Sequence, residues 1–202
     1  MIGINGAHRS GKSTLAKALS ERLGLPYLDA NVTPELLARG FDQVAPMSAE
    51  RRLACQEMRL ELFAAKIAAA PRPCITDRSF LDIAAYSLAE LTRMQEDPAL
   101  GGAVAEHVER CVHLTRLHFD HLIALRPLAG FEIADGHAPP NRGYQDHIQF
   151  LVDGMMLRCS SGGLLLTYLP YQDHAKRIAV AGAVIADRLA ANAGAGAAQP
   201  LH

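Results

Sequence analysis

Residues 6–13 read Gly-Ala-His-Arg-Ser-Gly-Lys-Ser and directly follow the short apolar run Met1–Asn5. They match the spacing Gly-x4-Gly-Lys-Ser/Thr. Glycines let the backbone curl so that successive N–H groups point to one place. The run Lys12–Leu23 carries apolar residues at helical spacing and is followed by Gly24, so the positive end of a helix meets the same place. The stretch predicts a strand, an anion-binding loop and a helix in succession.

The chemistry of this loop is that of a phosphate cradle. Lys12 is expected to reach the β- and γ-phosphates of a nucleotide, and the Ser13 hydroxyl to ligate Mg²⁺. We therefore expect ATP and Mg²⁺ as cofactors. The residues expected to contact the nucleotide are Gly6, Ala7, His8, Arg9, Ser10, Gly11, Lys12, Ser13 and Thr14.

The composition of the 202-residue chain predicts one globular domain, because half of the residues are hydrophobic and the formal net charge is −1. This charge excludes bulk electrostatic binding of nucleic acid, though not a local basic groove. The amino terminus lacks the pattern of a signal peptide, and no apolar run has the roughly 20 residues of a membrane span, so we expect a cytoplasmic protein without a membrane contact. The domain is expected over residues 1–190, followed by a flexible Ala/Gly tail over 191–202.

Short apolar runs alternate with longer amphipathic runs along the rest of the chain. This alternation predicts an α/β fold in which a five-stranded parallel sheet is covered by helices on both faces. Strands are expected at 1–5, 27–29, 74–77, 121–125 and 164–169, and helices at 12–23, 34–39, from Ser48 to before Pro71, 80–91, 100–117, 144–157 and 173–189.

Acidic residues end two of these strands, at the edge where parallel sheets bind ligands. Asp77 is expected to hold the magnesium shell or to accept a proton from an attacking hydroxyl, and Arg78 to clamp a phosphate. Asp29 is the alternative catalytic base or a ligand of the acceptor hydroxyl, with Glu35 as a rival and Arg39 as a further acceptor contact.

A Gly- and Pro-rich loop over about 128–143 contains Glu132, Asp135, His137 and Arg142. A loop of this length in a compact domain is typical of a lid. We expect it to close and to bring Arg142 onto the transferring phosphate. Arg126, at the end of the fourth strand, is expected to stack on the nucleotide base or to contact a phosphate.

The phosphate loop, the step Thr76-Asp77-Arg78-Ser79 and the loop ending at Arg142 follow one another in the order found in P-loop nucleoside and nucleotide kinases, and the chain resembles that group. Within it, the chain is similar to small AAA-type ATPase/kinase domains, such as ribosylnicotinamide kinase-like and phage deoxynucleotide kinase-like proteins. The resemblance spans residues 1–190 and implies the strand order 2-3-1-4-5, with Asp77 next to Ser13. It also implies transfer of the γ-phosphoryl group of Mg-ATP to a nucleoside hydroxyl or a nucleoside monophosphate.

Three functions follow from these patterns. The first is a kinase for a small nucleoside-type acceptor, with a hydroxyl slightly favoured over a monophosphate. The second, implied by a related phage branch, is phosphorylation of 5-hydroxymethyluracil in DNA, and it would use Arg51, Arg52, Arg59 and Lys66 as a basic face. The third is a nucleotide-dependent regulatory ATPase that has no acceptor.

Overall fold

A parallel sheet in the order β2-β3-β1-β4-β5 lies at the centre of the computed structural model, which describes residues 1–91, 97–130, 141–160 and 164–197. This arrangement confirms the expected fold class and strand order. The strands are β1 (Ile2–Asn5), β2 (Tyr27–Leu28), β3 (Ile75–Thr76), β4 (His121–Leu125) and β5 (Leu165–Leu169).

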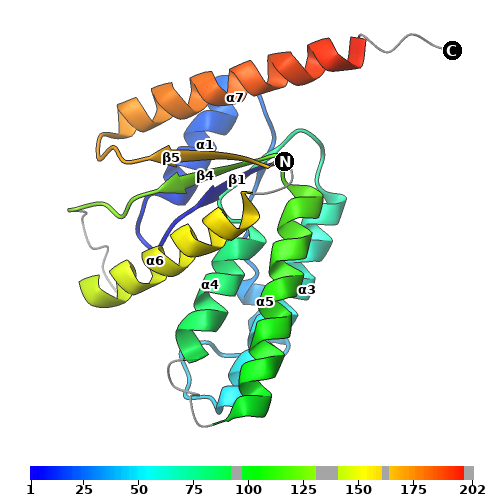
Figure 1. The fold of residues 1–202 in the computed structure, drawn as a ribbon, viewed down its shortest axis with the longest axis vertical. Coiled ribbons are helices and arrows are strands. Elements are labelled where there is room, and N and C mark those ends of the chain that lie inside the picture. The colour runs from blue at the N-terminus through cyan, green and yellow to red at the C-terminus, as the bar shows by residue number, and fades with distance from the viewer. Residues whose placement is uncertain (92–96, 131–140, 161–163, 198–202) are drawn as a thin grey trace, which may run out of the picture.

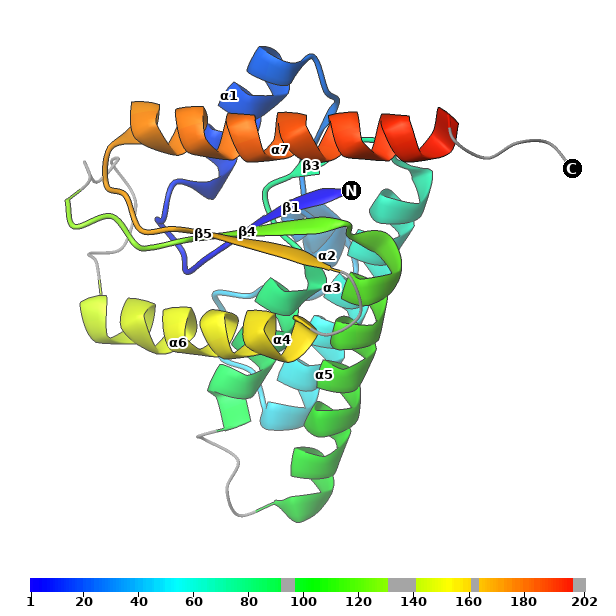
Figure 2. The ribbon, with the colours of Figure 1, turned by 45° about the horizontal axis from the view of Figure 1, so that its top comes forward.

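Helices cover both faces of the sheet. On one face lie α1 and α7, and on the other lie α3, α4, α5 and α6, of which α3, α4 and α5 extend away from the sheet (Figures 1 and 2). The helices are α1 (Lys12–Leu23), α2 (Thr33–Ala38), α3 (Ala49–Ala69), α4 (Phe80–Leu91), α5 (Pro98–His118), α6 (Arg142–Cys159) and α7 (His174–Ala197).

Two apolar clusters, one on each face, hold these layers together. Ile2 and Ile4 of β1 pack with Leu15 of α1 and Ile185 of α7. The opposite face buries a larger cluster that includes Phe80 of α4. Burial of a large apolar side chain stabilises a fold by about 1.5–3 kcal/mol, so these clusters fix β1 and the loop that follows it.

Polar residues fix the beginnings of three helices. Ser48, Asp97 and Asn141 each accept a hydrogen bond from the backbone N–H three residues further on, at 3.0–3.3 Å. Because Asn141 is such a cap, α6 begins at Arg142, whereas the sequence had placed Arg142 in the preceding loop. The centre of the expected lid, residues 131–140, lies outside the described residues.

The last helix is longer than expected. We placed its end at Leu189 and expected a frayed tail beyond it, but α7 continues to Ala197. Alanine has the highest intrinsic helix propensity, and the added residues include several alanines, which sustain the helix in spite of Gly194 and Gly196. In the part of the chain that the structure describes, no helix combines the length and the apolar character needed to cross a membrane.

Two buried histidines make the stability of this fold depend on pH. Burial lowers the pKa of His107 on α5 and of His121 on β4 to about 4 in each case, and the nearby Arg110 and Arg188, respectively, add to the effect. The ordinary value in an unfolded chain is near 6.5. Above it both states are neutral, and between pH 6.5 and 4 the unfolded chain takes up protons that the folded chain refuses.

We therefore expect the free energy of unfolding to fall as the pH drops from 6.5 to 4, by about 2 kcal/mol for each histidine. In His107→Gln, the free energy of unfolding, measured in urea between pH 6.5 and 4, should fall less steeply with decreasing pH. The control, His113→Gln, replaces an exposed histidine of the same helix. Equal pH dependence in the two variants would show that His107 does not carry the effect.

Candidate active site

The loop between β1 and α1 has the curled backbone that its sequence predicts. Gly6, Arg9 and Gly11 have φ values of 150°, 59° and 85°. A Cβ atom added at Gly6 would lie 2.9 Å from both the carbonyl oxygen of Leu125 and the Oγ of Ser10. Glycine is therefore required at position 6 both by its φ angle and by the close approach of β4.

Lys12 is folded back onto this loop. Its Nζ donates hydrogen bonds to the carbonyl oxygens of Gly6 and Ala7, at 2.6 and 2.7 Å, and the residue is 9% exposed. Burial lowers the pKa of Lys12 to about 8, and the carboxylates of Asp82 and Asp77 oppose that shift. The ammonium group thus lies at the loop, within the curl of its backbone.

The loop is also held from outside by three buried side chains. Arg177 of α7 is 1% exposed and donates to the carbonyl oxygens of Ser10 (2.6 Å), Tyr171 (2.6 Å) and Arg126 (2.8 Å). Two glutamines one turn apart on α6 complete the attachment. Gln145 donates to the His8 carbonyl at 2.8 Å, and Gln149 accepts from the Ala7 N–H at 3.0 Å.

Asp77 lies beside the loop, because β3 pairs directly with β1. Its carboxylate accepts hydrogen bonds from the Ser13 hydroxyl (2.5 Å), the Tyr27 hydroxyl (3.0 Å) and the Ala30 N–H (3.2 Å). The structure therefore brings together the two residues that the sequence predicts as metal ligands, Ser13 and Asp77. Ser13 is exposed, as is Thr14, whereas Asp77 is buried.

Asp82 is a carboxylate at this site that the sequence reasoning missed. It is 1% exposed, and its Oδ2 accepts from the backbone N–H of Ser79 at 3.1 Å. Burial raises the pKa of Asp82, while the nearby Lys12 and Arg78 oppose the shift. The spacing Ser79-x-x-Asp82 is a capping-box pattern and was visible in the sequence.

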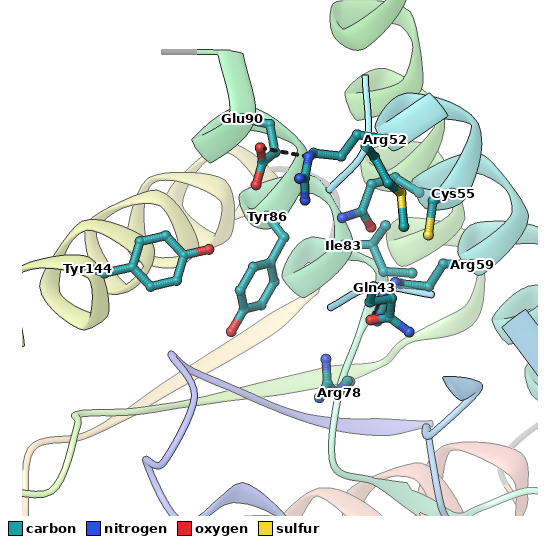
Figure 3. A pocket seen from close by; sticks show the side chains of 11 residues that line it. Gln43, Arg52, Cys55, Arg59, Arg78, Ile83, Tyr86, Glu90 and Tyr144 are labelled. Carbon is teal, nitrogen blue, oxygen red and sulfur yellow. Dashed lines mark hydrogen bonds and ion pairs between the residues drawn. The ribbon is translucent and has the colours of Figure 1, made fainter. Parts of the chain in front are cut away.

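A cavity of about 290 Å³ is lined by Arg78, the residue that follows Asp77. Arg78 enters it at the end nearest the sheet, and the opposite end holds Arg52 of α3 and Glu90 of α4, which form an ion pair at 3.2 Å (Figure 3). Tyr86 and Tyr144 form another wall, and the ring of Tyr144 lies 5.6 Å from the ring of His8 in the loop.

A second cavity of about 400 Å³ adjoins the loop on the side of β4. It is lined by Arg126, Leu128, Arg142 and Gln145, among others. Leu128 is 3.8 Å from the position of a Cβ on Gly11, and Gln145 is the residue that bonds to His8. Arg126 donates to the Tyr168 hydroxyl at 3.0 Å. The structure thus places the predicted residues Arg126 and Arg142 together at this cavity.

Other predicted acceptor residues do not line either cavity. Asp29 is exposed, and its Oδ1 accepts from the Asn31 N–H at 2.8 Å, as in an Asx turn. Glu35 pairs with Lys66 at 3.1 Å. Arg39 is exposed and donates to the Glu35 carbonyl. The predicted lid residues Glu132, Asp135 and His137 lie outside the described residues.

The basic residues of α3 do not form the common outward face that the DNA hypothesis uses. Arg52 and Arg59 line the smaller cavity. Arg51 bonds to the carbonyl of Gly40, and Lys66 bonds to Glu35 and Asn31. Positions 52 and 59 are seven residues apart and share a helix face, which is turned toward α4.

Arg177 lets the attachment of the loop be tested. Arg177→Met leaves three carbonyl oxygens without a donor, two of them in or beside the nucleotide-binding region. We expect a loss of about 2–4 kcal/mol in the free energy of unfolding, measured in urea. We also expect ADP affinity, measured by calorimetry, to fall by about tenfold or more because Ser10 is no longer fixed.

The matched control is Lys176→Met, which changes the adjacent exposed residue of α7 and should keep parental ADP affinity. Parental affinity in folded Arg177→Met would show that the loop keeps its shape without this arginine.

Comparisons with known proteins agree with this architecture. An AAA domain family model matches residues 1–138. Comparison with curated proteins gives no match. Two solved structures of deoxyadenosine kinase from M. mycoides share the fold: one with bound dCTP (TM-score 0.64, 14% identity) and one with the products dCMP and a flexible dCDP (TM-score 0.66, 15% identity). Each alignment covers 94% of this chain and 98% of the kinase chain.

The family model covers more than half of the chain, and the structural matches extend over almost all of it. The chain belongs to the AAA domain family and has the fold of the P-loop nucleoside kinases.

Proposed function

We propose that the protein is a Mg-ATP-dependent phosphotransferase that moves the γ-phosphoryl group to a nucleoside-type acceptor. One observation carries this proposal: two cavities are lined by residues that contact or neighbour the phosphate loop, and α6 contributes to both, with Tyr144 beside His8 in one and Arg142 and Gln145 in the other. A phosphoryl transfer enzyme needs this arrangement, because donor and acceptor must approach the same phosphorus atom from opposite sides.

The donor side fits ATP. The larger cavity adjoins Gly11 and the beginning of α1, so we assign it to the donor nucleoside, with Arg126 and Arg142 on its wall. Lys12 would exchange its two carbonyl partners for phosphate oxygens. The Ser10 Oγ is buried without a hydrogen-bond partner, which supports a ligand of this loop with acceptor atoms.

The oxygen ligands offered by Ser13 and Asp77 also fit Mg²⁺. A hydroxyl and a carboxylate, those of Ser13 and Asp77, meet at 2.5 Å. Hard divalent cations prefer oxygen ligands of this kind, and Mg²⁺ usually combines one or two protein ligands with substrate phosphates. Bound Mg²⁺ supplies neutralisation of the charge that develops on the phosphates. Tyr27 and the Ala30 N–H hold Asp77 in place for this role.

The acceptor side is the smaller cavity. It extends from Arg78, next to Asp77, to the Arg52–Glu90 ion pair. Its volume is near the lower end of the about 300–1,000 Å³ of ordinary ligand pockets, which suits one small molecule. Solved structures with this fold include a deoxyadenosine kinase that holds dCTP or dCMP, and this supports a nucleoside-type acceptor.

The alternative functions have less support. A regulatory ATPase needs no acceptor cavity, and the cavity lined by Arg78 favours an enzyme with an acceptor. The DNA hypothesis used a basic face on α3, and two of its four residues, Arg52 and Arg59, line the acceptor cavity instead. Phosphorylation of 5-hydroxymethyluracil in DNA therefore stays a prediction of the resemblance, without a surface that favours it among the described residues.

Lys12 gives the direct test of this function. Lys12→Ala should lower kcat by about 10²–10³-fold or more, because it removes a positive charge at the transferring phosphate. ADP formation with Mg-ATP and a panel of nucleosides and nucleoside monophosphates measures the effect. Lys12→Met keeps the buried stem and should lose activity equally.

The control is Lys17→Ala, on the exposed side of the same helix, which should retain the parental rate. Circular dichroism and thermal unfolding show whether each variant is folded. A folded Lys12→Met with parental turnover would exclude the assigned site.

A further inference from the structure

The end of the acceptor cavity near the phosphate loop carries two arginines, Arg59 and Arg78, that form no ion pair among the described residues. Arg78 forms no hydrogen bond or ion pair with any residue in the described ranges. Arg59 donates to the side-chain oxygen of Gln43, and its Nε is buried without a hydrogen-bond partner. Both guanidinium groups line the same cavity (Figure 3).

These two arginines are close enough to affect each other. Burial lowers the pKa of Arg59, and the positive charge of Arg78 adds to that effect. Two like charges at one cavity wall are unfavourable unless an anion joins them, because each has lost part of its hydration. Guanidinium groups are suited to binding phosphate with paired hydrogen bonds.

No carboxylate of the described lining neutralises this end, and the buried Asp82 near Arg78 lies outside that lining. Among the described lining residues, Glu90 is the only carboxylate, and it is paired with Arg52 at the opposite end. The described lining therefore carries three positive charges and one negative charge, and the excess lies next to the phosphate loop.

Among the described residues, no carboxylate other than the paired Glu90 lines this cavity to deprotonate an acceptor hydroxyl. Asp77 accepts three hydrogen bonds from the chain itself. Asp29 is exposed outside the lining. Asp82 is buried, is not part of the described lining and accepts from the Ser79 N–H. A hydroxyl acceptor gains from a base in hydrogen-bond reach, whereas a phosphate monoester is already ionised at neutral pH and needs none.

We infer that the acceptor is a nucleoside monophosphate whose phosphate is held by Arg59 and Arg78. This inference rests on the proposed function and reverses the slight preference for a hydroxyl acceptor that we drew from the sequence. An oxygen of the acceptor phosphate forms the new bond to the γ-phosphorus, and the bond from that phosphorus to the bridging oxygen breaks. The products are ADP and a nucleoside diphosphate, without a proton being removed from the acceptor.

The opposite end of the cavity is suited to the base of the same molecule. The Arg52–Glu90 pair offers both hydrogen-bond donors and acceptors, and Tyr86 gives an aromatic surface between the two ends. The edge of a base carries donors and acceptors that such a charged pair recognises, and its flat face packs on an aromatic ring. One mononucleotide thus satisfies both ends of the cavity.

Matched pairs of nucleosides and their 5′-monophosphates test this inference. We expect wild-type kcat/KM to be at least about tenfold higher for the monophosphate of the preferred base than for its nucleoside. Arg59→Gln should lower kcat/KM for the monophosphate by about 10–100-fold, mainly through KM, with KM for ATP unchanged. Arg110→Gln, an exposed arginine of α5 outside the cavity, should behave as wild type.

Calorimetric binding of the same monophosphate without ATP gives a second reading that does not depend on turnover. Binding that Arg59→Gln abolishes, together with no phosphoryl transfer to any acceptor, would support the anion site and overturn the proposed function. Efficient phosphorylation of nucleosides with no gain from a 5′-phosphate would leave the kinase function intact and overturn the inference. Monophosphate affinity and kcat/KM that are unchanged in folded Arg59→Gln would also overturn it.

Discussion

Hydrogen bonds to the carbonyl oxygens of the phosphate loop are the constraint on which the site depends. The carbonyls of Gly6 and Ala7 accept from Lys12, that of His8 from Gln145, and that of Ser10 from Arg177. A peptide unit whose carbonyl is held by a helix outside the loop directs its N–H away from that helix, so the bonds at His8 and Ser10 organise the loop before a ligand arrives. The Ala7 N–H is an exception, because it is bonded to Gln149. The donors come from three helices, α1, α6 and α7, and the loop therefore has its shape only in the complete fold.

The parallel sheet then determines what surrounds the loop. Pairing of β3 with β1 places the end of β3 beside the beginning of α1, which is why Asp77 meets Ser13 and why Arg78 enters the adjoining cavity. Pairing of β4 with β1 places Arg126 and Leu128 on the other side of the loop. The carboxyl ends of parallel strands form the ligand crevice in open α/β sheets, and both cavities adjoin this edge.

Local sequence was sufficient for much of the fold. Helical periodicity predicted the bounds of α1 and α4, and the glycine-bearing motif predicted the loop. Contacts between distant residues were not predictable in this way. Arg177 is 167 residues from its partner Ser10, and nothing in its neighbourhood in the sequence indicates a buried role. The face of α3 that carries Arg52 and Arg59 was also ambiguous, because a charged helix face has the same periodicity whether it meets solvent or a polar cavity.

A crystal structure with a non-hydrolysable ATP analogue, Mg²⁺ and a nucleoside monophosphate tests the central claim, that loop 6–13 holds the phosphates of a donor between two cavities. We expect the β- and γ-phosphates at this loop, the Nζ of Lys12 moved from the Gly6 and Ala7 carbonyls to phosphate oxygens, and the donor base in the cavity of Arg126. Density for the triphosphate at any other place on the molecule would contradict it.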